Sequence, residues 1–153
     1  TVFAIISYWP VGVISSRIGR KKMIQIGISM LAAGFLVGAT LKSMNAVMYI
    51  LFALVGMGWA SIGVNSFPMV VEMATGADTG KYTGYYYAFS MAAQICTPLL
   101  SGLLIDNLGL GYRVLFPYAV LFSLLSFCTM TQVKHGDSKP QAKQAALDAL
   151  NND

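Results

Sequence analysis

The sequence predicts an all-α membrane protein, a polytopic bundle of helices that cross the lipid bilayer. Only 10% of the 153 residues are charged and 56% are apolar, and the mean hydropathy is +0.64. A soluble domain carries about 25% charged residues, so this chain has too little polar surface to be solvated as a globule. The polar residues also gather in short clusters, and the runs between them approach the roughly 20 residues that a helix needs to cross a hydrocarbon core.

We expect one partial membrane-spanning helix and four complete ones. The approximate limits are 1–16 for the partial helix and 23–41, 46–73, 83–105 and 112–133 for the complete ones. Thr1 already stands in an apolar run, without an initiator Met or a charged leader, which predicts a chain cut within a span of a larger protein. Residues 134–153 are polar and are expected to form a flexible tail, with a short Ala-rich helix at 141–150.

The basic residues predict how the bundle is oriented. Arg17, Arg20, Lys21 and Lys22 lie within six positions between the first two apolar runs. If this loop is cytoplasmic, alternation of the helices places eight of the ten Lys and Arg residues on the cytoplasmic side. Because positive charge concentrates in cytoplasmic loops, we expect this loop and the tail 134–153 to be cytoplasmic.

The helix expected at 83–105 carries a polar stripe. Five of its polar residues fall within about 60° of one another when successive residues are placed at 100° intervals. They are Thr83, Ser90, Gln94, Thr97 and Ser101, and Tyr86 and Tyr87 flank them. Unsatisfied polar groups are costly in lipid, so the stripe is expected to line a water-filled cavity. The alternative is hydrogen bonding between helices.

The helix expected at 46–73 carries two further candidates for contact with a solute. Asn65 is near the middle of the bilayer, and its amide both donates and accepts hydrogen bonds, which suits a hydroxylated ligand. The flat ring of Trp59 is of the kind that stacks on a sugar. Packing of this ring against Gly56 and Gly63 is an equally supported interpretation.

Glu72 is the one carboxylate within an expected span, near its cytoplasmic end. It could be a proton site, an interfacial acid or one partner of an ion pair. We favour an ion pair with Arg17 or Arg20, because a charge at this membrane face is best stabilised by an opposite charge.

The helices expected at 23–41 and 112–133 look peripheral, since they carry few polar residues. The first contains Gly34 and Gly38 in a GxxxG spacing, with Gly27 on a nearby face. Small residues at this spacing allow close approach of another helix.

Several classes of function are excluded by the composition. His135 is the only histidine, and no nucleophile–base pair or metal-ligand cluster is visible, so we expect no enzyme, no cofactor and no metal site. Cys96 and Cys128 lie in apolar runs and are expected to be small buried hydrophobes. The basic residues that give the net charge of +4 lie at loop boundaries, and no aromatic residues alternate with them. This pattern excludes a nucleic-acid partner.

The string from Gly12 to Lys22 resembles a signature of the major facilitator superfamily. The family's form is G-x-x-x-D-R-x-G-R-[KR]-[KR], in the loops after the second and eighth helices, and Ser16 stands here at the Asp position. The resemblance implies the C-terminal half of that fold, from late helix eight to helix twelve, without its N-terminal half. The tenth and eleventh helices of this fold approach the central cavity, whereas the ninth and twelfth are outer helices.

A further likeness involves the string from Gly56 to Glu72, together with Gly80 to Tyr87, Gln94, Pro98 and Phe116-Pro-Tyr. It resembles bacterial relatives of the glycoside–pentoside–hexuronide cation symporters and the proton–sucrose symporters. This implies a secondary active transporter in the bacterial plasma membrane that moves a sugar or glycoside with protons by alternating access. The partners implied are a sugar-like solute, protons, the bilayer and the N-terminal half of the same transporter.

Two sets of candidate residues follow from these observations. The substrate-binding candidates are Trp59, Asn65, Tyr86, Tyr87, Ser90 and Gln94. The gating candidates are Gly12, Arg17, Gly19, Arg20, Lys21 and Glu72. Two other functions stay open: export of amphipathic compounds, which predicts a cavity lined by Met and Phe, and a membrane sensor or assembly subunit that transports nothing.

Overall fold

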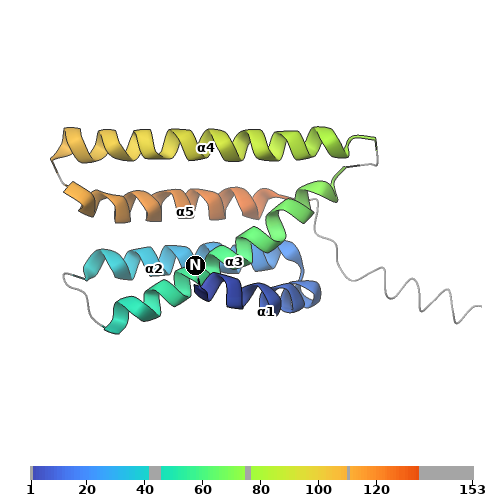
Figure 1. Ribbon diagram of the computed structural model, residues 1–153, viewed down its shortest axis with the longest axis horizontal. Coiled ribbons are helices and arrows are strands. Elements are labelled where there is room, and N and C mark those ends of the chain that lie inside the picture. The colour runs from blue at the N-terminus through green and yellow to red at the C-terminus, as the bar shows by residue number, and fades with distance from the viewer. Residues whose placement is uncertain (1, 42–45, 75–76, 110, 135–153) are drawn as a thin grey trace, which may run out of the picture.

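The structure, a computed structural model, describes residues 2–41, 46–74, 77–109 and 111–134. These residues form α1 (Val2–Ile18), α2 (Arg20–Thr40), α3 (Ala46–Val71), α4 (Thr79–Leu108), the 3-10 helix η1 (Gly111–Val114) and α5 (Leu115–Gln132) (Figure 1). Four segments of this part of the chain are long and apolar enough to cross a membrane. The predicted all-α class is therefore confirmed.

The helix boundaries differ from the expected ones mainly where polar residues join a helix. α2 begins at Arg20 rather than near residue 23, so the basic residues form its first turn. α4 is longer at both ends than the expected 83–105, and the expected start of the last span is the separate η1. The predicted tail, with its possible short helix, lies almost wholly outside the described residues.

A single residue, Gly19, joins α1 to α2. Its backbone angles are φ 94° and ψ 148°, a conformation that is essentially restricted to glycine. The Gly19 amide still donates to the Ser15 carbonyl at 3.0 Å, and its own carbonyl accepts from Met23 at 3.2 Å. Gly19 therefore ends one helix and begins the next without losing backbone hydrogen bonds. At Gly12, in contrast, an added Cβ would meet nothing within 4 Å.

α2 is the central helix of the bundle, since it packs against both α3 and α5. Ile24 and Ile28 of α2 form the core with Met69 of α3, and partly buried apolar residues of α3 and α5 cover them. Figure 1 shows the turn between α1 and α2, the carboxyl end of α3 and the carboxyl end of α5 at the same end of the bundle. This end carries the basic cluster.

Glycines set the close contact between α2 and α3. A Cβ on Gly27 would lie 2.7 Å from the Gly58 carbonyl oxygen, and a Cβ on Gly58 would lie 2.8 Å from that of Gly27. Gly34 and Gly38 contact side chains instead, of Val55 at 2.6 Å and of Phe116 at 2.8 Å from an added Cβ. The predicted close approach is therefore present, but the contact between backbones lies at Gly27, about two turns before Gly34.

α4 contacts the rest of the described chain sparsely. Its packing is confined mainly to α3 and to η1, and none of its membrane-length apolar window is buried. Its separation from the other helices leaves the cavities described below.

Candidate functional site

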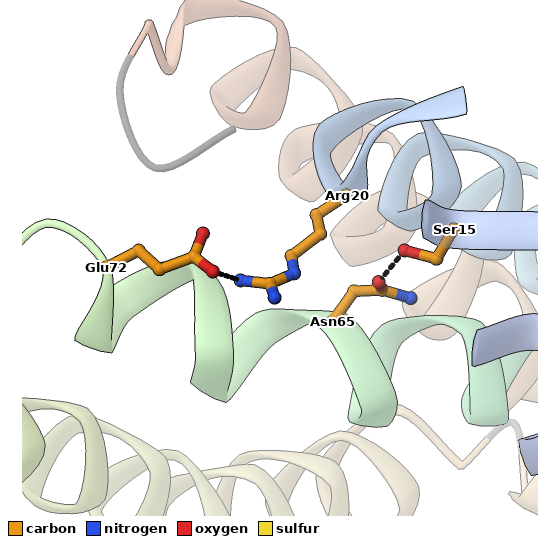
Figure 2. Close-up of polar contacts among 4 residues, drawn as sticks. All are labelled: Ser15, Arg20, Asn65 and Glu72. Atoms are coloured by element: carbon orange, nitrogen blue, oxygen red, sulfur yellow. Dashed lines mark hydrogen bonds and ion pairs between the residues drawn. The ribbon is translucent and has the colours of Figure 1, made fainter. Parts of the chain in front are cut away.

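Glu72 and Arg20 form an ion pair between α3 and α2 (Figure 2). Glu72 directly follows the carboxyl end of α3, and Arg20 is the first residue of α2. Each charge is disfavoured by the dipole of its own helix, because it has the same sign as the partial charge at that helix end. Pairing offsets both effects. The predicted ion pair of Glu72 with Arg17 or Arg20 is therefore present, with Arg20 as the partner.

The other basic residues of the cluster lie differently. Arg17 is exposed in the last turn of α1, where a positive charge complements the helix dipole. Lys22 is exposed as well. Lys21 is half-buried, and its Nζ donates to the carbonyl oxygens of Thr131 at 2.9 Å and of Val133 at 2.5 Å. The basic cluster is thus connected to α3 through Arg20 and to α5 through Lys21.

Asn65 is buried between α3 and α1, with 1% of its surface exposed. The Ser15 hydroxyl of α1 donates to its Oδ1, as Figure 2 shows, and its Nδ2 donates to the Ser61 carbonyl at 2.7 Å. Both ends of the amide are therefore used within the protein. This geometry makes Asn65 a connection between helices and does not support its assignment to solute binding.

Tyr86 and Tyr87 form an aromatic cluster with Phe67 of α3. The ring centroids are 5.4 Å apart for Phe67 and Tyr86, 5.8 Å for Phe67 and Tyr87, and 5.4 Å between the tyrosines. The Tyr86 hydroxyl also lies 3.2 Å from the Ser66 hydroxyl. These contacts hold the first half of α4 against α3, and they leave about half of Tyr87 exposed.

Ser90 and Gln94 continue the polar stripe along α4. The Gln94 Nε2 donates to the Ser90 hydroxyl at 3.4 Å, and the Gln94 side chain is exposed. Ser90 and Tyr86 also line a small hollow of about 460 Å³, whose other walls are apolar or aromatic. The amide of Gln94 is therefore accessible to a further hydrogen-bond partner.

A cavity of about 1190 Å³, called the large cavity below, lies between α4 and the other helices. Trp59 is 63% exposed and forms part of its wall. The hydroxyl groups on the wall belong to Tyr8, Thr97, Ser101, Tyr118, Ser123 and Ser126. The remaining lining is largely apolar, with Phe35, Phe52 and Phe122, and none of these lining residues is charged.

The six substrate-binding candidates do not converge on one site in the described part of the chain. Trp59 lies at the large cavity, Tyr86 and Ser90 at the small hollow, and Asn65 in the contact between helices. Sequence reasoning missed the roles of Ser15 and Lys21, whose partners are 50 and 110 or more residues away in the chain. No local pattern marks either residue as a hydrogen-bond donor to a distant helix.

The geometry of this bundle is similar to that of solved transporters. A crystal structure of a mutant of the peptide transporter POT superimposes with a TM-score of 0.76 at 17% sequence identity, covering 98% of this chain and 33% of that one. The same transporter in complex with sulfate matches with a TM-score of 0.72 at 17% identity, over 98% and 35% of the two chains. The chain thus spans about a third of the transporters that it matches.

The sequence was also compared with family models and with curated proteins. No curated protein matched. The predicted kinship with sugar symporters is not supported by these comparisons, which reach the level of the superfamily. The family model of the Major Facilitator Superfamily matches residues 1–150. The chain therefore belongs to the Major Facilitator Superfamily.

Proposed function

We propose that the full-length protein is a secondary active transporter, in which this chain forms most of one half. The observation that carries the proposal is the polar stripe of α4, in which Gln94 and Thr97 are exposed. Gln94 stands exposed near the middle of a helix that is long and apolar enough to span a membrane. An amide at this depth needs water or a polar partner, because lipid provides neither. Because the chain belongs to a transporter superfamily, we infer that this water lies in a solute pathway.

The Arg20–Glu72 ion pair is proposed as a gate at the end of the bundle that carries the basic cluster. It joins the amino end of α2 to the carboxyl end of α3, and its side chains are 26% and 35% exposed. A pair with this exposure contributes modest stability, so it can break and form again during a transport cycle. We propose that the pair forms when this end is closed, and that this end is cytoplasmic.

The solute proposed is a sugar or glycoside, carried with protons. Tyr87, Ser90 and Gln94 support an uncharged, hydroxylated ligand, because their polar atoms donate and accept hydrogen bonds and carry no charge. The matched structures are of a peptide transporter. A free peptide has two charged ends, whereas the α4 stripe and the walls of the large cavity offer no charged partner among the described residues. We therefore favour the sugar and keep the peptide as a competing outcome of the test.

The large cavity is proposed to be the seat of a further membrane helix of the full-length protein. The chain spans about a third of the matched transporters, and the wall of this cavity is mostly apolar and uncharged. Hydroxyl groups such as those of Thr97 and Ser101 would then bond to that helix. If the cavity is instead open, its phenylalanine-rich lining favours the second candidate function, export of amphipathic compounds.

Uptake into proteoliposomes that contain the full-length protein tests the proposed function. Labelled disaccharide, aryl glycoside and dipeptide are compared with and without a proton gradient. We expect saturable, gradient-dependent uptake of a sugar, and a rise of its KM by about fivefold to tenfold in Gln94→Leu, since a hydrogen bond contributes about 1 kcal/mol. Gln25→Leu, on α2 and outside the α4 stripe, is the matched control. Saturable uptake of the dipeptide alone would overturn the substrate, and no uptake of any solute would overturn the transporter.

A further inference from the structure

The first turn of α2 holds three consecutive cations, Arg20, Lys21 and Lys22, and no acidic residue. The amino end of a helix carries a partial positive charge, so this arrangement destabilises α2 unless the cations find partners elsewhere. Arg20 finds Glu72 of the α3 end. Lys21 extends to a different helix, and its contact is not explained by the gate.

Lys21 contacts the carboxyl end of α5. Its Nζ donates to the carbonyl oxygens of Thr131 at 2.9 Å and of Val133 at 2.5 Å. Val133 has left the helical conformation, with φ −66° and ψ 124°. The last carbonyl groups of a helix have no partners within it and carry its partial negative charge. A lysine from another helix thus supplies both the hydrogen bonds and the charge that this helix end lacks.

Apolar contacts hold the same end of α5 from the side. Phe127, Met130 and Val133 pack against the core formed by Ile24, Ile28 and Met69. Val133 therefore takes part twice, through its side chain in the core and through its carbonyl group at Lys21. These apolar contacts do not prevent the last turn of α5 from sliding or fraying, because burial of apolar surface does not favour one direction over another. The two hydrogen bonds from Lys21 define its position.

We propose that Lys21 is a positioning residue that latches the end of α5 to the turn between α1 and α2. Two adjacent residues, Arg20 and Lys21, then clamp α3 and α5 to the beginning of the same helix. The ends of α2 and α5 then stay joined through Lys21 while α3 is released and recaptured as the Arg20–Glu72 pair opens and closes. A lysine suits the latch because its compact ammonium carries three donors, enough for two carbonyl groups that lie close together.

Hydrogen exchange of the full-length protein in lipid nanodiscs tests the latch without reference to transport. Lys21→Met keeps most of the aliphatic stem but removes the charge and the donors. We expect its amides in the last turn of α5 to exchange about tenfold faster, the change that corresponds to about 1.4 kcal/mol. Lys22→Met removes the same charge from the next position and should leave this exchange unchanged. Lys21→Arg should restore part of the protection, because it keeps the charge and the donors but replaces the compact ammonium with a planar guanidinium.

Equal exchange in the Lys21→Met and Lys22→Met proteins would overturn the latch. Lys21→Gln, which keeps one donor group, takes the place of Lys21→Met if that variant does not fold, and is judged by the same comparison. A second readout rests on the proposed function: Lys21→Met should lower the maximal uptake rate at unchanged KM. If the protein transports none of the solutes, the exchange experiment still decides the latch, so the two proposals fail separately.

Discussion

Asn65 shows, at the scale of single residues, how burial changes the role that a polar side chain can have. Its position near mid-membrane is compatible with ligand binding, yet the structure places the Ser15 hydroxyl at its Oδ1 and the Ser61 carbonyl at its Nδ2. A buried amide is expensive when one of its groups is left without a partner. The stability of the α1–α3 contact should therefore depend on Ser15.

We predict that Ser15→Ala lowers the free energy of unfolding by about 1–2 kcal/mol, because it leaves the buried Oδ1 of Asn65 unsatisfied. Ser16→Ala is the matched control, since the Ser16 hydroxyl is exposed and bonds to the carbonyl of Val13 in its own helix. Reversible unfolding in mixed micelles measures both. Equal destabilisation by the two variants would contradict the role of Ser15.

At the scale of elements, backbone contact at two glycines determines how α2 and α3 cross. The Gly34 and Gly38 spacing correctly predicted close packing of α2, although these residues receive side chains of Val55 and Phe116. The partner of Gly27 is Gly58 of α3, and Gly58 is not part of a GxxxG sequence. Sequence spacing indicates which face of a helix carries small residues, but the residues of the neighbouring helix determine where the closest contact occurs.

We predict that Gly27→Ala destabilises the protein by about 1–3 kcal/mol, as overpacking of a tight contact does. An added Cβ would lie 2.7 Å from the Gly58 carbonyl oxygen, and backbone cannot rotate away as a side chain can. Gly63→Ala is the control within α3, because its Cβ would meet nothing within 4 Å. Thermal unfolding followed by circular dichroism measures the difference. Similar melting temperatures for the two variants would show that α2 and α3 are not in backbone contact.

At the scale of the whole molecule, three connections converge on one end of the bundle. The turn at Gly19, the Arg20–Glu72 pair and the Lys21 contact join α1, α2, α3 and α5 there. α4 lies outside this set and is held mainly by its aromatic contacts with α3 and by its connection to η1. α4 is therefore the α-helix least firmly joined to the rest of the described bundle.

The proposed gate predicts coupling between Arg20 and Glu72. Glu72→Gln and Arg20→Gln should each slow uptake by roughly fivefold, the effect of about 1 kcal/mol expected of a partly exposed pair. The charge swap, Arg20→Glu with Glu72→Arg, should restore part of the rate. Initial uptake rates of the wild type, the two single Gln variants and the variant that combines both Gln substitutions form a double-mutant cycle. Independent, additive losses would argue against the pair as a gate.

The proposed seat for a further helix predicts which positions on α4 are shielded. In a protein with Cys96→Ser and Cys128→Ser, we expect Thr97→Cys to react slowly with a membrane-impermeant thiol reagent, because the helix covers it. Gln94→Cys should react faster, since it faces the proposed solute pathway. Mass spectrometry of the labelled protein measures both rates. Rapid labelling of Thr97→Cys would instead indicate a water-filled cavity and favour the amphipathic substrates.

Much of the fold was predictable because it depends on local properties of the chain. Composition, the length of the apolar runs and the spacing of charges indicated membrane helices near their observed positions. The charge argument paired Glu72 with Arg17 or Arg20, and the structure selects Arg20. The candidate site was less predictable. Helical periodicity places Ser90, Gln94 and Thr97 on one face, but it does not state what faces them. The neighbour of that face depends on residues far away in the sequence.

The amino-acid sequence by itself determined the membrane environment, the helical class and the face of α4 that must avoid lipid, because these follow from how each short segment interacts with its solvent. The tertiary structure decided which polar groups meet each other. Ser15 contacts Asn65 across 50 residues, and Lys21 contacts Val133 across 112. Such pairs depend on how helices stack and cross, and the packing of small residues such as Gly27 against Gly58 helps to set that geometry.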